Sequence, residues 1–229
     1  MGLALARRLV AAGHDVRLGS RDPERGCERA AKVGAAFGGS CAAAAVDAEA
    51  IILAVPWHSV PRTLDTLGDL ENVILVDTTN PFVEGSATDL CELPGPSGAE
   101  LIQEMARDAR VVKAWNHLYA GLLRRSVDID GSKPTIFIAG DDSEAKELVA
   151  GLVFDTGYEP ADAGELSSAR YLEPLAALMT TLDRNSGGEA IHALKLLRRE
   201  RLGAGGRGRE GDGALVAAGI EPPPAASAA

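Results

Sequence analysis

The first 21 residues, MGLALARRLVAAGHDVRLGSR, constrain the fold more than any other stretch of the chain. Apolar residues recur there every three or four positions, which predicts an amphipathic helix, and Gly13 follows where that helix would end. Val16 and Leu18 then indicate a short strand that ends at Ser20 and Arg21. Helix, turn and strand in this order are typical of the second half of a βαβ unit that binds a dinucleotide.

The two residues at the end of that strand bear on which dinucleotide is bound. A carboxylate there accepts hydrogen bonds from the adenosine ribose of NAD, whereas a neutral residue beside an arginine accommodates the extra phosphate of NADP. Ser20 is neutral and Arg21 follows it, so the pair predicts NADP(H) with a charge-assisted contact from Arg21 to the phosphate. The alternative for Arg21 is a solvated arginine that precedes a helix.

Gly2 stands where the glycine loop of such a unit should end. As the third glycine of G-x-G-x-x-G, Gly2 would open the helix, and Gly2 and Leu3 would lie against the pyrophosphate. The first strand and the first two glycines would then precede Met1. One alternative is therefore a non-catalytic truncated remnant or an NADP-sensing module, and another is an internal methionine taken as the start.

Helices and strands alternate along the remaining chain. Buried apolar runs and helix-start signals predict the following elements: strands at 51–55, 73–77, 111–115, 134–139 and 158–161, and helices at 22–33, 40–49, 57–67, 99–109 and 144–154. The alternation predicts an α/β fold, a Rossmann-like doubly wound parallel sheet that is N-terminally truncated.

Two C-terminal helices are expected after the sheet, over 166–182 and 188–201. The first carries apolar residues spaced for burial: Leu172, Leu175, Leu178, Met179 and Leu182. We divide the chain into an NADP-binding domain (1–165), a C-terminal helical segment (166–201) and a disordered tail (202–229) that is rich in Gly, Arg, Pro and Ala.

Composition excludes several classes of function. A net charge of −10 disfavours binding to nucleic acid or to an anionic membrane surface. No apolar run approaches the ~20 residues of a membrane span, and the three cysteines lack metal-ligand spacing. We expect a cytoplasmic protein with reduced thiols and no metal site.

Ligands of doubly wound sheets bind beyond the carboxyl ends of the strands, where this chain carries several polar residues. Ala54, Val55 and Pro56 would form an apolar wall that lets the backbone approach a cofactor, or only the end of a buried strand. Asn80 offers an amide to a ribose or nicotinamide, and an ordinary turn is the alternative.

The next strand end carries Lys113, Asn116 and His117. A lysine within a buried strand is unusual because burial of its ammonium is costly without a partner. Asn116 and His117 are placed where a nicotinamide and its hydride acceptor could meet, although a surface histidine is the favoured interpretation of His117. No neighbouring residues in the sequence indicate a chemical role for His14 or His192, and His58 is typical of a helix start.

Several segments together resemble a known family: GLALARRLVAAGHDVRLGSRDPE, IILAVPW, VDTTNPF, GAELIQEMARDARVVKAWNH and ARYLEPLAALM. In order and spacing they are similar to the NADP oxidoreductases that use the deazaflavin coenzyme F420. The resemblance implies NADP(H) bound by Ser20, Arg21, the wall 54–56 and Asn80. It also implies an acceptor site near residues 113–116 and the helix around Glu173, and a homodimer through the C-terminal helices.

The sequence thus predicts an NADP(H)-dependent oxidoreductase, provided that the N-terminal unit is complete. Hydride would pass between NADP(H) and a deazaflavin or similar small-molecule acceptor, so catalysis would consist mainly of holding the two at about 3–3.5 Å. No catalytic side chain is predicted. The family commonly has Phe-Asn-Thr where this chain has Trp115-Asn116-His117, which leaves the acceptor open.

Overall fold

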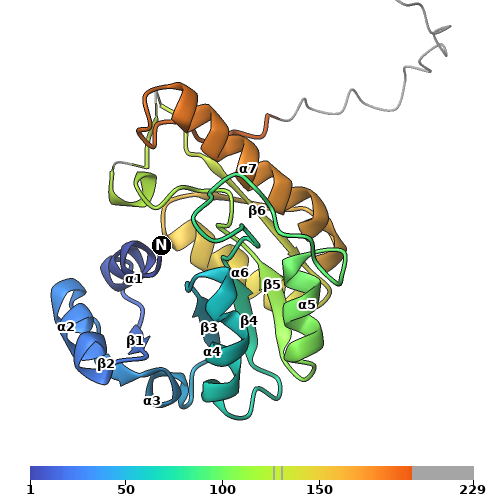
Figure 1. Ribbon diagram of the computed structural model, residues 1–229. Coiled ribbons are helices and arrows are strands. Elements are labelled where there is room, and N and C mark those ends of the chain that lie inside the picture. Colours follow the sequence, from blue (N-terminus) through green and yellow to red (C-terminus); the bar gives the residue numbers. More distant parts are fainter. Residues whose placement is uncertain (126, 130, 198–229) are drawn as a thin grey trace, which may run out of the picture. The chain divides into compact units, whose positions relative to one another are not determined.

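The structure is a computed structural model that describes residues 1–125, 127–129 and 131–197 (Figure 1). Residues Met1–Leu196 form one compact unit. The tail predicted over 202–229 and the last four residues of the helix predicted over 188–201 lie outside the described residues.

The N-terminal elements form a two-stranded parallel sheet with its own helices (Figure 1). In chain order these are α1 (Gly2–Ala11), β1 (Arg17–Ser20), α2 (Pro23–Val33), β2 (Phe37–Ser40) and α3 (Cys41–Ala45). Strand β2 was not predicted because its sequence, FGGS, has few apolar residues. Packing requires a glycine at position 38, since a Cβ on Gly38 would lie 2.5 Å from the backbone oxygen of Gly26 in α2.

A five-stranded sheet forms the rest of the unit, in the order β3-β4-β5-β6-β7 (Figure 1). The strands are β3 (Ala50–Leu53), β4 (Ile74–Asp77), β5 (Arg110–Lys113), β6 (Thr135–Gly140) and β7 (Glu159–Asp162). The helices are η1 (Trp57–Ser59), α4 (Val60–Leu67), α5 (Gly98–Met105), η2 (Leu122–Arg124), α6 (Ser143–Asp155), η3 (Leu166–Ser168) and α7 (Ala169–Asn185).

Two hydrophobic clusters cover the faces of this sheet. Ile74, Val76 and Val112 belong to the cluster that also contains residues of α1 and α6. Leu75 and Val111 belong to the cluster with α4 and α5. Successive strand residues point to opposite faces, so strands that are apolar at every position are buried on both sides. The doubly wound α/β fold is confirmed.

Strand pairing differs from the prediction in two respects. Strand β6 runs antiparallel to β5, so the sheet is mixed, although β7 is parallel to β6. In the described part of the chain, β1 pairs only with β2 and β3 only with β4, so the two sheets do not share a ladder. Both β1 and β3 are therefore edge strands.

The helix predicted over 188–201 is wrong for the residues that can be checked. After α7 the chain turns at Gly187 and Gly188, with φ of 95° and 81°, and residues 189–197 are not helical. This segment is held to the start of β6, because Thr135 N donates to Leu194 O at 2.7 Å and Leu196 N donates to Thr135 Oγ1 at 3.0 Å. Hydrogen bonds to β6 thus replace those of a helix.

The burial expected along α7 is also only partly correct. Leu172 and Met179 are buried, whereas Leu178 and Leu182 are 54% and 39% exposed. Helix α7 continues through Pro174. None of the described helices combines the length and apolarity that a membrane span requires.

Candidate functional site

The carboxyl ends of β3, β4 and β5 lie level with one another. Leu53 is opposite Asp77, and Asp77 is opposite Lys113, so the loops that follow begin at the same edge of the sheet. Thr78 N and Oγ1 both donate to Leu53 O, at 3.3 and 2.9 Å, which ties the start of one loop to the strand beside it. This edge is where ligands of doubly wound sheets bind.

Helix α1 begins beside the end of β3. A Cβ on Gly2 would lie 3.1 Å from the Cβ of Ala54, so a glycine permits this close approach. Met1 O accepts from the backbone N–H groups of Ala4 and Leu5. In the part of the chain that the structure describes, no acceptor reaches the N–H groups of Gly2 and Leu3, which leaves the positive end of the helix open to an anion.

Ser20 and Arg21 lie at the end of β1, in the two-stranded sheet. Arg21 is exposed and makes no hydrogen bond or ion pair with any described residue. Burial raises the pKa of the Cys41 thiol at the start of α3, against the opposing charge of the nearby Arg21 guanidinium. Arg21 is therefore a cation without a carboxylate partner in the described structure, and it is available to an anionic ligand.

Asn80 and Asn116 hold one another across the ends of β4 and β5. Asn116 Nδ2 donates to Asn80 Oδ1 at 2.9 Å and to Leu172 O at 2.8 Å, and Asn80 Nδ2 donates to Asn116 O at 2.8 Å. These bonds fix the orientation of the Asn116 amide. Its Oδ1 is buried without a hydrogen-bond partner, which is costly unless a ligand N–H or a water donates to it.

His117, expected as a surface residue, is only 5% exposed. Its Nε2 lies 3.2 Å from Thr135 O, while Nδ1 is buried without a partner. Burial lowers the pKa of His117 to about 4, and the bond to Thr135 only partly opposes this effect. The ring is therefore neutral at pH 7, with Nε2–H donating to Thr135 and Nδ1 an unused acceptor.

The turn that presents Asn116 and His117 contains a strained residue. Trp115 is fully buried and has a φ of 55°, in the left-handed region that bulky residues rarely adopt. Such strain persists only where the surroundings enforce it, and it is concentrated at functional sites. Here it accompanies the reversal of the chain directly after β5.

Lys113, a predicted cofactor contact, donates its hydrogen bonds to groups of the protein itself. Its ammonium, 0% exposed, donates to Asp77 Oδ2 at 2.7 Å, Thr79 O at 2.8 Å and Glu173 Oε1 at 2.8 Å. All three N–H donors are used, so none remains for a ligand. Burial by itself lowers the pKa of Lys113, but the charges and hydrogen bonds of Asp77 and Glu173 outweigh it and leave the pKa raised.

Glu173 extends this network to a second helix. Its two carboxylate oxygens accept from Gly98 N at 3.0 Å and from Ala99 N at 3.1 Å, at the start of α5. The positive end of α5 thus offsets the second carboxylate of the cluster. Lys113 and Glu173 thus join β5, α5 and α7 by hydrogen bonds, and the ammonium has no N–H left to donate to a ligand.

A pocket of about 160 Å³ lies where these groups meet. Its lining includes Thr78, Asn80, Asn116 and His117 from the strand ends, and Met179, Thr180, Asp183 and His192 from α7 and the segment after it. Ser20, Arg21 and the wall 54–56 are not among the lining residues. The structure therefore brings Asn80 and Asn116 together and places the predicted phosphate contacts apart from them.

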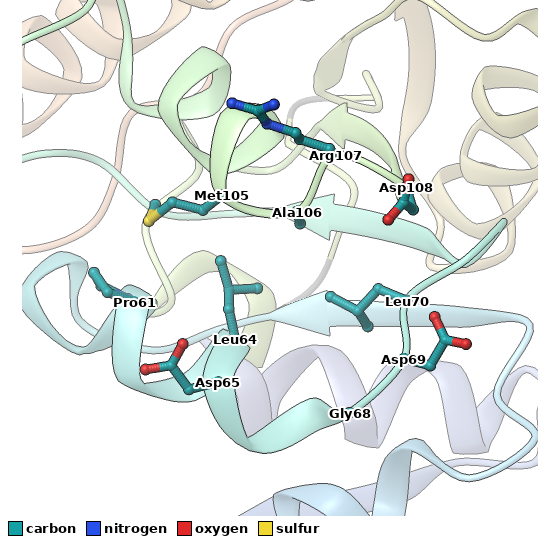
Figure 2. A pocket seen from close by; sticks show the side chains of 10 residues that line it. All are labelled: Pro61, Leu64, Asp65, Gly68, Asp69, Leu70, Met105, Ala106, Arg107 and Asp108. Carbon is teal, nitrogen blue, oxygen red and sulfur yellow. The ribbon is translucent and has the colours of Figure 1, made fainter.

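A larger pocket, of about 410 Å³, lies at the opposite ends of the strands (Figure 2). Its residues come from α4, from the end of α5 and from the loops that lead into β4 and β5. Figure 2 shows apolar Leu64 and Leu70 within it, with the carboxylates of Asp65, Asp69 and Asp108 around them. Because ligands of this fold bind at the carboxyl ends, the smaller pocket is the candidate site.

Sequence reasoning missed the pair Asp183 and His192. The sequence indicated no chemical role for His192, but its Nδ1 lies 2.8 Å from Asp183 Oδ1, and both residues line the smaller pocket. The nine-residue separation spans the end of α7 and the turn after it, so no sequence periodicity could reveal the contact. In the described residues no group of metal ligands was found.

Comparisons with known proteins show which family the chain resembles. Residues 1–81 match the family described as NADP oxidoreductase, coenzyme F420-dependent. The F420-dependent NADP reductase of Methanothermobacter marburgensis is 33% identical over 207 residues, which cover 81% of this chain and 91% of that protein.

Solved structures give the same result. A protein of Arthrobacter sp. to which F420-dependent NADP reductase activity has been ascribed has a TM-score of 0.76 and 28% identity, over 86% of this chain and 94% of its own. A hypothetical protein of Sinorhizobium meliloti has a TM-score of 0.66 and 31% identity, over 73% and 82% of the two chains.

Proposed function

Because this chain belongs to the family of coenzyme F420-dependent NADP oxidoreductases, we propose that it transfers hydride between NADP(H) and coenzyme F420 at the pocket of Asn80 and Asn116. Membership of this family makes the chain an NADP-dependent oxidoreductase. The acceptor and the roles of individual residues are the parts that the proposal adds.

The groups present fit a bound dinucleotide. Arg21 is a cation without a partner in the described structure and suits the phosphate that distinguishes NADP from NAD. The open N–H groups of Gly2 and Leu3 suit the pyrophosphate. Asn116 Oδ1 and His117 Nδ1 are buried acceptors that an N–H donor, such as the carboxamide of a nicotinamide, would satisfy.

NADP(H), when bound, supplies or takes up the hydride. The residues of the chain bind and orient the reactants, which is what a direct hydride transfer requires. Asn80 fixes Asn116, and the cluster of Lys113, Asp77 and Glu173 fixes the strand ends on which they stand.

We also propose that the protein is a homodimer. Four apolar residues spaced three or four apart form a stripe on α7: Tyr171, Leu175, Leu178 and Leu182. Tyr171 and Leu178 are 77% and 54% exposed in the single chain. A second copy that packs its own stripe against this one would cover them.

The preference for NADP over NAD is inferred from Arg21, whose guanidinium makes no hydrogen bond or ion pair with any described residue. Titration with NADPH and NADH should show tighter binding of NADPH, and addition of oxidised coenzyme F420 should then lead to its reduction. Equal affinities would contradict the cofactor assignment. Binding without turnover would contradict the acceptor and favour a sensing module.

Replacement of Arg21 tests the phosphate contact directly. We expect Arg21→Ala to weaken NADPH binding by ~1.5–3 kcal/mol, because a hydrogen bond to a charged group is lost, and to leave NADH binding unchanged. Arg29→Ala, which removes an exposed arginine from α2, is the matched control. If both variants bind NADPH equally well, Arg21 is not at the phosphate.

A further inference from the structure

Asp183 and His192 form a pair with the geometry of an oriented acid–base group. His192 Nδ1 lies 2.8 Å from Asp183 Oδ1, and the same oxygen accepts from the backbone N–H groups of His192 and Ile191, at 3.0 and 3.1 Å. The carboxylate is buried, with its side chain 8% exposed, whereas the imidazole is 35% exposed. A carboxylate on one ring nitrogen orients the imidazole and leaves the other nitrogen for chemistry.

His192 belongs to the candidate site, and its second ring nitrogen is free. His192 and Asp183 line the same pocket as Asn80 and Asn116. Within the described residues Nε2 makes no hydrogen bond, and because it lies across the ring from Nδ1 it is directed away from Asp183. The imidazole is held in place, since its segment is bonded to Thr135 at Leu194 and Leu196.

We propose that His192, oriented by Asp183, exchanges the proton that accompanies hydride transfer to the acceptor in this pocket. The inference rests on the proposed function, which supplies NADPH as the hydride donor and an unsaturated nitrogen heterocycle as the acceptor. His117, the other imidazole of the pocket, is committed to Thr135 and buried, so it does not compete for this role.

The reaction takes up one proton for each hydride, and His192 is placed to supply it. When a carbon of the acceptor gains hydrogen with both electrons from NADPH, a double bond of the acceptor breaks and its electron pair moves onto a heteroatom. The Nε2–H bond of protonated His192 then breaks, and the proton forms a new bond to that heteroatom. NADP and reduced acceptor result, and the exposed imidazole regains a proton from water. In the reverse direction neutral His192 accepts the proton.

Asp183 is a positioning residue in this scheme. Its carboxylate accepts the Nδ1–H bond throughout and stabilises the imidazolium by its charge. A buried carboxylate that is held by two backbone N–H groups cannot rotate away from the ring without loss of those bonds.

The first test is His192→Gln with NADPH as donor and oxidised coenzyme F420 as acceptor. Loss of a general acid typically costs 10²–10⁴-fold, so we expect kcat to fall by about 10²-fold or more while the Kd of NADPH changes less than about threefold. His14→Gln is the matched control, because His14 pairs with Asp155 at 3.0 Å, is 33% exposed and is absent from the pocket lining. Its kcat should equal that of the unaltered chain. A fall of less than about tenfold in His192→Gln overturns the proposal.

A second readout does not depend on turnover. Coenzyme F420 is added to the NADP complex, and the imidazole proton resonances of His192 and His14 are followed by NMR. We expect the His192 resonance to move as the acceptor binds and the His14 resonance to stay. An unmoved His192 resonance in the presence of bound acceptor overturns the proposal. If the unaltered chain binds NADPH but neither binds nor reduces F420, the proposed acceptor fails. If the chain reduces F420 while the His192 resonance stays unmoved, the role of His192 alone fails.

Asp183→Asn separates positioning from structural support. The amide oxygen can still accept from the N–H groups of Ile191 and His192, but the negative charge that faces the Nδ1–H group of His192 is lost. The other titratable groups that line the pocket are His117, Tyr119 and the Met1 amino group. They are identical in the unaltered chain and in Asp183→Asn, so a difference between the two pH profiles comes from residue 183. We expect the alkaline limb of the kcat–pH profile to move to lower pH, because the imidazolium is less stabilised. An unmoved limb excludes Asp183 from the role.

Discussion

At the scale of single residues, the buried cluster of Lys113, Asp77 and Glu173 shows how geometry can reverse an expectation. A lysine at a strand end near a ligand site suggested a ligand contact, yet its three donors are used within the protein. Two buried carboxylates share this single ammonium as their cation. Removal of one partner of a buried charge pair is costly because the remaining charge is left without compensation.

We therefore expect Lys113→Met to lower the free energy of unfolding by about 3–5 kcal/mol. The control is Lys146→Met, whose partner Asp162 has a side chain that is 63% exposed; an exposed pair of this kind contributes at most about 1 kcal/mol. Urea unfolding of both variants at pH 7 measures the difference. Equal losses would show that the cluster does not stabilise the fold.

His117 makes stability depend on pH in a defined window. Burial lowers its pKa from 6.5 to about 4 in the folded protein, so between these values the unfolded chain binds more protons. Stability is then complete above pH 6.5 and is lost as pH falls toward 4, by about 3 kcal/mol in total.

In His117→Gln this part of the acid dependence should disappear. The free energy of unfolding, measured at pH 7 and pH 4.5, should fall by about 2–3 kcal/mol less in the variant than in the unaltered chain. His14→Gln, at a histidine that is one-third exposed, is the control and should retain the dependence. An identical fall in all three proteins would argue against a buried neutral imidazole.

At the scale of elements, the division into two sheets predicts uneven stability. Strands β1 and β2 form a two-stranded sheet, whereas β4 is paired on both sides. Two-stranded sheets are marginal without further pairing, and local opening follows the number of shared backbone bonds.

Hydrogen exchange followed by mass spectrometry should show this difference. We expect the amides of β1 to exchange about tenfold faster or more than those of β4 in the free protein. Saturating NADPH should slow exchange in β1 if Ser20 and Arg21 bind it, and β7, far along the sheet order, serves as the internal reference. Equal protection of β1 and β4 would contradict the prediction.

At the scale of the whole molecule, the exposed stripe of α7 bears on assembly. Its three leucines were predicted to be buried, and a dimer is the arrangement in which that prediction would hold for Leu178 and Leu182. Leu178→Asp should convert a dimer to a monomer in light scattering, because a carboxylate would be buried in an apolar contact. Phe154→Asp, at a residue of α6 that is 64% exposed, is the control and should leave the mass unchanged. A monomeric unaltered chain would remove the dimer from the proposal.

The sequence alone determined the doubly wound class, the strand ends at which polar residues gather, and the order of helices and strands apart from β2 and the helix predicted over 188–201. These features depend on local periodicity, capping residues and apolar runs, all of which are properties of neighbouring residues. Residues such as Pro23 and Asp22, which begin α2 as predicted, act within one turn of the chain.

Only the tertiary structure decided which polar groups meet. The bonds of Lys113 to Glu173, of Asn116 to Leu172 and of His192 to Asp183 join residues that are brought together by the packing of α7 and the segment after it. Residues 189–197 are not helical, although their pattern predicts a helix. Their backbone groups form hydrogen bonds with the backbone N–H and the hydroxyl of Thr135 instead. Hydrogen bonds between distant segments leave no periodicity in the sequence, so the pairing of His192 with Asp183 could be found only in the folded chain.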